Sequence, residues 1–249
     1  MIPTVDITEI VDDLRRHAKE LVRAFEDEPH GDEVDPRGPI DALQGCLEAC
    51  RRIEHESHDI PIPGHDVRCG PDIKAIGDHA LDVLSRLAAL AGRLHRPQEA
   101  MGIEALALPL ACWIARNGGE LSHLPPIVNA AAALANSVKE PTQLERLYSL
   151  LSEIVGAVSP RVSQDTTSRD PTRPWRILVL NRAIVATRSH QPILMEEAFE
   201  ALIEQLPDDA PDFFREGMEQ MEALNYPQQV RVVMQRYYDQ WCTGRTLLH

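Results

Sequence analysis

The chain has 249 residues, of which 43% are hydrophobic, 26% are charged and 4% are aromatic. This composition is typical of a soluble globular protein and excludes a disordered or collagen-like chain. The 25 basic residues face 39 acidic ones, so the formal net charge is −14. Phosphate backbones and anionic membrane surfaces repel such a chain, and no apolar run is long enough to span a bilayer. We therefore expect neither nucleic acid nor membrane as a partner.

The N-terminal residues and the cysteines indicate the compartment. The stretch from Met1 to Asp6 has neither the basic start nor the apolar run of a signal peptide. The five cysteines are an odd number at irregular spacing, which does not suit a disulfide framework. We therefore expect a cytoplasmic protein.

Three amphipathic helices are predicted in the N-terminal part of the chain, because apolar residues recur there every three to four positions. Asp6, followed three residues later by Glu9, is typical of a helix N-cap. The apolar stripes comprise Ile7, Ile10, Val11, Leu14, Ala18, Leu21, Val22 and Phe25, then Ile40, Leu43, Cys46, Leu47, Cys50 and Ile53, then Ile73, Ile76, Ala80, Val83, Leu84, Leu87, Ala91 and Leu94.

The next segments are more uniformly apolar. Residues 105–115 and 127–138 are apolar on most sides, which is typical of helices in a protein centre. Pro109 is expected to kink the first of them, because proline lacks the amide hydrogen that an inner helix position uses. A sixth helix is predicted from about residue 142 to residue 158 by its leucine and isoleucine spacing.

The segment 159–174 is predicted to be a polar loop, since it is poor in apolar residues and contains three prolines. It divides the chain into a helical sub-domain at 1–158 and a second at 175–249, which we expect to pack on the first. Pro174, Pro192, Pro211 and Pro227 then follow at intervals of 18, 19 and 16 residues. Proline suits the first turn of a helix, so these intervals predict four consecutive helices.

The sequence thus predicts an all-α fold of about ten helices in antiparallel pairs, either a solenoid-like superhelix or a compact bundle. Residues 176–186 also allow a short β-hairpin because of their β-branched content, although the helical neighbours favour a helix. The spacing of about 35–37 residues per pair is near the tetratricopeptide period. The detailed residue pattern does not match, and we assign no family.

Potential metal ligands gather between the second and third predicted helices. Imidazole and thiolate groups suit Zn²⁺, which needs three or four donors in tetrahedral reach. The spacing matches no strong zinc signature, and a turn-rich polar connection would contain the same residue types. The candidate ligands are His55, His58, His65, Cys69 and His79.

The charge is unevenly distributed in the C-terminal third. Residues 160–188 contain six arginines and two acids, a local charge of +4, whereas residues 190–226 contain ten acids and one arginine, a local charge of −9. These segments could pair with each other inside one fold, or the arginines could bind an acidic partner. The candidate partner-binding residues, which include the arginines and aromatics of the C-terminal end, are Arg161, Arg169, Arg173, Arg176, Tyr237, Tyr238, Trp241 and Arg245.

No nucleotide-binding glycine loop, zinc-hydrolase motif or nucleophile elbow occurs in the sequence. Many paired helices, few functional motifs and asymmetric charge favour a non-enzymatic scaffold that binds a protein partner. A metal-dependent all-α enzyme and a small-molecule-binding helical protein are the alternatives, the latter with a pocket around Trp113, Arg116 and Asn129. The sequence does not determine the oligomeric state.

Overall fold

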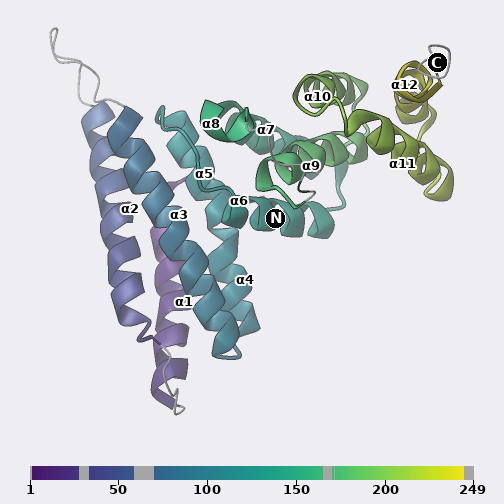
Figure 1. Ribbon diagram of the computed structural model, residues 1–249. Coiled ribbons are helices and arrows are strands. Elements are labelled where there is room, and N and C mark those ends of the chain that lie inside the picture. Colours follow the sequence, from purple (N-terminus) through teal and green to yellow (C-terminus); the bar gives the residue numbers. More distant parts are fainter. Residues whose placement is uncertain (1, 28–33, 59–69, 165–169, 171, 244–249) are drawn as a thin grey trace, which may run out of the picture. The chain divides into compact units, whose positions relative to one another are not determined.

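A computed structural model describes residues 2–27, 34–58, 70–164, 170 and 172–243 of the chain (Figure 1). The described residues are helical with short connections and contain no β-strand, only an isolated bridge between Leu121 and Val158. The all-α prediction is confirmed. The helices are α1 (Ile7–Asp27), α2 (Arg37–His58), α3 (Gly70–Arg93), α4 (Pro97–Ala105), α5 (Ala107–Arg116), α6 (Pro125–Ser137), α7 (Pro141–Ala157), α8 (Pro160–Ser163), α9 (Pro174–Arg188), α10 (Pro192–Gln205), α11 (Ala210–Ala223), α12 (Gln228–Tyr238) and a π-helix, η1 (Asp239–Thr243).

The chain forms two compact units. One, the N-terminal unit, comprises Pro3–Ala133 and Glu153–Gln164, and the other, the C-terminal unit, comprises Met1–Ile2, Leu134–Ser152 and Asp165–His249. The division therefore falls inside α6 and α7. The predicted loop at 159–174 contains one helical turn, α8, because Pro160 stands at its first position after the extended Ser159.

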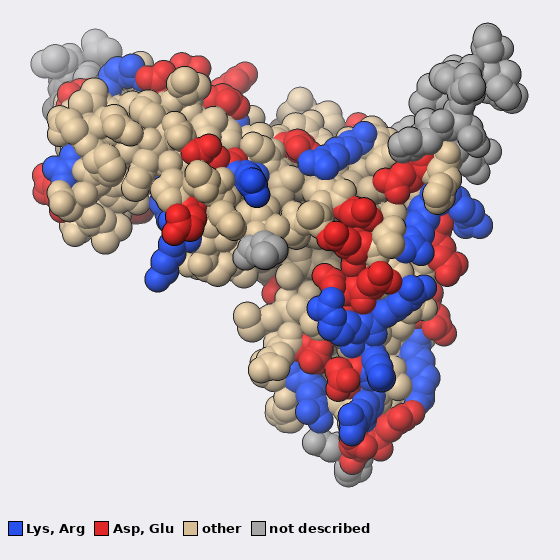
Figure 2. Space-filling model, turned by 180° about the vertical axis from the view of Figure 1, so that it is seen from behind, with Lys and Arg blue, Asp and Glu red and all other residues tan. Residues whose placement is uncertain are grey.

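In the N-terminal unit, each of the helices α1 to α4 packs against the next, and α4 also contacts α1 (Figure 1). Helix α5 contacts α1, α3 and α4. The predicted stripe of α1 is largely buried, including Ile7, Leu14 and Leu21. Asp6 caps this helix as predicted, since its carboxylate accepts a hydrogen bond of 2.7 Å from the Thr8 amide. Figure 2 shows acidic and basic side chains interspersed on the outer surface of these helices.

The sequence predicts a kink at Pro109, and the structure has a break between α4 and α5 just before this residue. Leu106 separates the two helices, and Pro109 lies in the first turn of α5. Proline has no amide hydrogen to donate to Ala105, and its ring would clash with that carbonyl group in a continuous helix. The break lets α5 bury Leu108, Leu110 and most of its other side chains.

Gly102 lies where α4 meets α1. A Cβ atom at this position would lie 2.2 Å from Cε1 of His17. The same ring forms a hydrogen bond of 2.6 Å between its Nδ1 and a carboxylate oxygen of Glu99. Glycine therefore allows the imidazole of α1 to lie directly against the backbone of α4.

We expect Gly102→Ala to lower the free energy of unfolding by about 1–2 kcal/mol, because overpacking costs about 1–3 kcal/mol and the better helix propensity of alanine offsets part of it. Urea denaturation followed by circular dichroism measures the change. In a His17→Ala background, the same substitution should be neutral or stabilising. An equal loss in both backgrounds would rule out the clash as its cause.

In the C-terminal unit, α9 pairs with α10, α11 pairs with α12, and α12 also contacts α10. The predicted proline positions hold: α9 and α10 begin at Pro174 and Pro192, Pro211 lies in the first turn of α11, and Pro227 directly precedes α12. The helix predicted at 176–186 is confirmed as part of α9. Among the described residues, none of the helices is both long and apolar enough to cross a membrane.

Candidate functional site

The candidate partner-binding residues lie in different environments. Arg161 is exposed in α8, and Arg173 is half-buried beside the start of α9. Arg176 forms an ion pair of 2.7 Å with Asp209. This pair joins the basic and acidic segments inside one unit, as one of the two interpretations of the charge distribution expects. Arg169 and Arg245 lie outside the described residues.

The aromatic candidates at the C-terminal end also differ in exposure. Tyr237 is only 6% exposed, and its ring packs against Phe199 and Phe214. The ring of Tyr237 therefore belongs to the core of the unit, and its contact role stays a prediction. Tyr238 and Trp241 are half-buried. The register changes after Tyr238, since the chain continues as the wider π-helix η1.

The candidate metal ligands are only partly described. His55 in α2 and His79 in α3 are exposed. His65, Cys69 and the side chain of His58 lie outside the described residues. Within the part of the chain that the structure covers, no three donors of the histidine, cysteine, aspartate or glutamate type converge. The zinc site stays a prediction.

The three residues of the predicted small-molecule pocket form hydrogen bonds with neighbouring side chains. Trp113 is 2% exposed, and its indole nitrogen lies 3.4 Å from a carboxylate oxygen of Glu54. Arg116 forms hydrogen bonds of 2.7 and 3.1 Å with the carboxylate of Glu153. The remaining side chain, Asn129, donates to Glu104 at 2.8 Å.

Two cysteines are deeply buried in the N-terminal unit. Burial raises the pKa of Cys50 to about 12, and it raises the pKa of Cys112 to about 12 as well. A thiol with such a pKa stays protonated at neutral pH, and only the thiolate is a strong nucleophile or metal ligand. Cys50 and Cys112 therefore act as small core side chains.

A buried polar cluster connects α7, α9 and α10 in the C-terminal unit. The Arg182 side chain is 7% exposed and donates hydrogen bonds to Ser152, Tyr148 and Glu197 at 2.8, 2.6 and 2.7 Å. Its guanidinium carbon also lies 4.8 Å from the centre of the Tyr148 ring. Desolvation raises the pKa of Tyr148 to about 12, so its hydroxyl group remains protonated. These contacts indicate a structural role.

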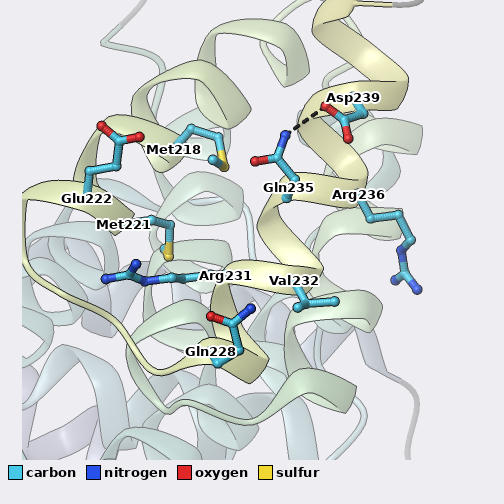
Figure 3. A pocket seen from close by; sticks show the side chains of 9 residues that line it. All are labelled: Met218, Met221, Glu222, Gln228, Arg231, Val232, Gln235, Arg236 and Asp239. Carbon is cyan, nitrogen blue, oxygen red and sulfur yellow. Dashed lines mark hydrogen bonds between the residues drawn. The ribbon is translucent and has the colours of Figure 1, made fainter.

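A shallow, open groove lies between α11 and α12 in the C-terminal unit. Its volume is about 540 Å³. We call it the α11–α12 groove, and its lining residues are Met218, Met221, Glu222, Gln228, Arg231, Val232, Gln235, Arg236 and Asp239. Figure 3 shows Met218, Met221 and Glu222 on the α11 side and the remaining residues along α12, with Asp239 at the start of η1. Arg236 points away from the two methionines.

The groove exists because α12 has two different faces. One face buries Val230, Val233, Met234 and Tyr237 in the core. The lining residues 228, 231, 232, 235 and 239 follow a second stripe of three-to-four spacing, which is open to solvent. Val232 on this stripe is 57% exposed.

Sequence reasoning did not find this groove. Met218, Met221 and Leu224 share a three-to-four spacing with Phe214, a pattern that predicts one buried stripe. Phe214 and Met221 are buried, but Met218 is half-buried and Leu224 is 63% exposed, because α11 ends at Ala223. The available signal was Val232, an apolar residue outside the core stripe of its helix.

The fold and the site together define an all-α protein with an open, partly apolar groove on a helical hairpin. A scan against family models, a search of curated proteins and a search of solved structures each found no match for this chain.

Proposed function

We propose that the chain is a non-enzymatic scaffold that binds a protein partner on the hairpin of α11 and α12. The observation that supports this function is the α11–α12 groove, whose lining includes the exposed Val232 and the half-buried Met218. Exposed apolar surface gathered around a hollow is typical of an interaction site. Covering it removes apolar area from water, which favours the complex.

A small-molecule site is the alternative that the groove volume also allows, since pockets for such ligands span about 300–1,000 Å³. Small-molecule pockets are lined mainly by apolar and aromatic side chains. Here three of the nine lining residues are apolar and none is aromatic. This mixed lining resembles a protein–protein interface, in which apolar centres are surrounded by polar side chains.

Site-specific photo-crosslinking tests the proposed function. The full-length chain would carry benzoylphenylalanine either at Val232, in the groove, or at Ile193, which is 78% exposed at the start of α10. After illumination in a lysate of cells that make the chain naturally, we expect one protein adduct from position 232 and much less from position 193. Mass spectrometry would identify the crosslinked peptide. Equal adducts from both positions, or none, would contradict the proposal.

A further inference from the structure

Two consecutive hairpins of the C-terminal unit repeat the same structure at an interval of 35 residues. We call α9–α10 the first hairpin and α11–α12 the second hairpin. The buried side chains of α10 are Met195, Ala198, Phe199 and Leu202, and those of α12 are Val230, Val233, Met234 and Tyr237, each 35 positions later. The same interval relates Trp175, Val179 and Ala186, which are buried in α9, to Ala210, Phe214 and Met221, which are buried in α11. This equivalence indicates two copies of one structural repeat.

The turn inside each hairpin repeats at the same interval. His190 follows α9 with a φ angle of 61°, and Asn225 follows α11 with a φ angle of 50°. Both residues adopt the left-handed conformation that commonly ends a helix. A proline stands two positions further on in each copy, at Pro192 and Pro227. The two hairpins therefore share their turn as well as their buried positions.

The second hairpin packs on one face of the first, and two ion pairs join them. Arg236 of α12 pairs with Glu196 of α10 at 2.7 Å. Asp209, which directly precedes α11, pairs with Arg176 of α9, also at 2.7 Å. The contact between α10 and α12 belongs to the same interface. The chain thus contains one example of a hairpin that is covered by the hairpin after it.

The corresponding face of the second hairpin is the α11–α12 groove. On α9, Ala183 and Thr187 are buried on the same side as Arg176, because seven and eleven positions are about two and three helical turns. Their equivalents 35 positions later are Met218 and Glu222, which line the groove and are half-buried and exposed, respectively (Figure 3). The groove is therefore the uncovered copy of the face on which the second hairpin packs.

We propose that the α11–α12 groove takes a further helical hairpin, supplied by a protein partner, in the way that the first hairpin takes the second. This inference rests on the proposed function and specifies the kind of partner. Each unit of a repeat protein packs on its neighbour, so the last unit leaves one such face open. The interface between the two hairpins of this chain shows which element covers a face of this kind.

The partner hairpin is expected to carry a carboxylate where the second hairpin carries Arg236. That arginine meets Glu196, but the equivalent of Glu196 in the groove is Arg231. Arg231 donates to two neutral groups, the carbonyl oxygen of Tyr226 and the side chain of Asn225, both at 2.7 Å. A carboxylate would neutralise its charge. A second copy of the chain fits less well in this geometry, because it would bring Arg236 against Arg231 and like charges in an interface repel.

A lengthened chain tests the inference. Residues 209–249, which contain α11 and α12, are repeated after Thr243 in place of residues 244–249, so the added hairpin follows at the same interval of 35 residues. In one version the added copy is unaltered, and in the other it carries Arg236→Glu. The covalent connection gives the added hairpin a high effective concentration at the groove, so a face that fits a hairpin should hold it.

Chymotrypsin measures whether the added hairpin is held, because it cleaves beside aromatic residues, which both versions contain in equal number. Mass spectrometry follows the loss of the added hairpin. We expect the version with glutamate to lose it at least threefold more slowly, since the new carboxylate meets Arg231. Arg231→Glu in the original hairpin should reverse this order. As a control, Arg215→Glu in the added copy makes the same change of charge at an exposed position and should alter the rate less than twofold.

Two results would overturn the inference. One is rapid loss of the added hairpin from every version, because a face built for a hairpin would hold a tethered one. The other is an equal rate for the glutamate and arginine versions, because Arg231 would then not select the partner. Light scattering checks the other occupant: a dimer of the unaltered chain that Met218→Arg dissolves would reject a separate partner in favour of a second copy.

The two proposals can fail separately. A protein adduct from position 232, together with an added hairpin that is not held, would retain the scaffold function and reject a hairpin as the bound element. A hairpin that is held in the expected order of charges, without any adduct in the lysate, would support the fit of the groove to a hairpin and contradict the proposed function. Failure of both experiments would reject both proposals.

Discussion

Replacing Phe199 with alanine is expected to lower the free energy of unfolding of the C-terminal unit by about 3–5 kcal/mol, the usual cost of removing a buried phenylalanine ring. Phe199 is 0% exposed, and its ring centre lies 5.2 Å from that of Phe214 and 5.2 Å from that of Tyr237. These rings come from α10, α11 and α12, so one ring connects three helices. The cavity left by alanine would therefore weaken the packing of both helices that form the groove.

Urea denaturation followed by circular dichroism measures this loss. Phe199→Leu is the matched control, since leucine retains most of the apolar volume and should cost less than about 1.5 kcal/mol. A loss below about 1 kcal/mol for the alanine variant would show that the aromatic cluster does not hold these three helices together.

Replacing Arg182 with alanine is expected to cost about 2–4 kcal/mol. Removing the guanidinium group breaks its buried hydrogen bond to the hydroxyl group of Tyr148, and a hydrogen bond that involves a charged group contributes about 1.5–3 kcal/mol. The lost packing of the arginine stem adds to this cost. Glu197 contributes little, because its side chain is 57% exposed and water can solvate it in the variant.

A double-mutant cycle separates these contributions. In the pair Arg182→Ala and Tyr148→Phe, each single variant already breaks the hydrogen bond between the two side chains, so the double variant should be less destabilised than the sum of the single variants. The measurement is the denaturation midpoint in urea at neutral pH. Strict additivity of the two losses would mean that the hydrogen bond between these side chains does not stabilise the unit.

Much of the secondary structure could be predicted because its signals are local. The three-to-four spacing from Ile7 to Leu21 predicted α1, the position of Asp6 predicted its N-cap, and the spaced prolines after residue 173 predicted the starts of α9 to α12. These signals depend on backbone geometry within one helix, so a single sequence contains them.

The candidate site could not be predicted in the same way, since exposure depends on which helix covers which face. Tyr237 has the composition of an interface residue but is buried by Phe199 and Phe214, which stand 38 and 23 positions earlier in the chain. Val232 is exposed because the core face of α12 is taken by Val230 and Val233. Both outcomes follow from packing between helices.

The sequence by itself determined that this protein is helical, where α9 to α12 begin and that its net charge is negative, because these properties follow from residue spacing, proline geometry and composition. Only the tertiary structure decided that Arg176 meets Asp209, that Arg182 is enclosed and that methionines of α11 face an open stripe of α12. The physical reason is that hydrophobic burial is non-directional: it selects apolar faces but does not specify their partners. Shape and charge between distant segments make that choice when the helices pack.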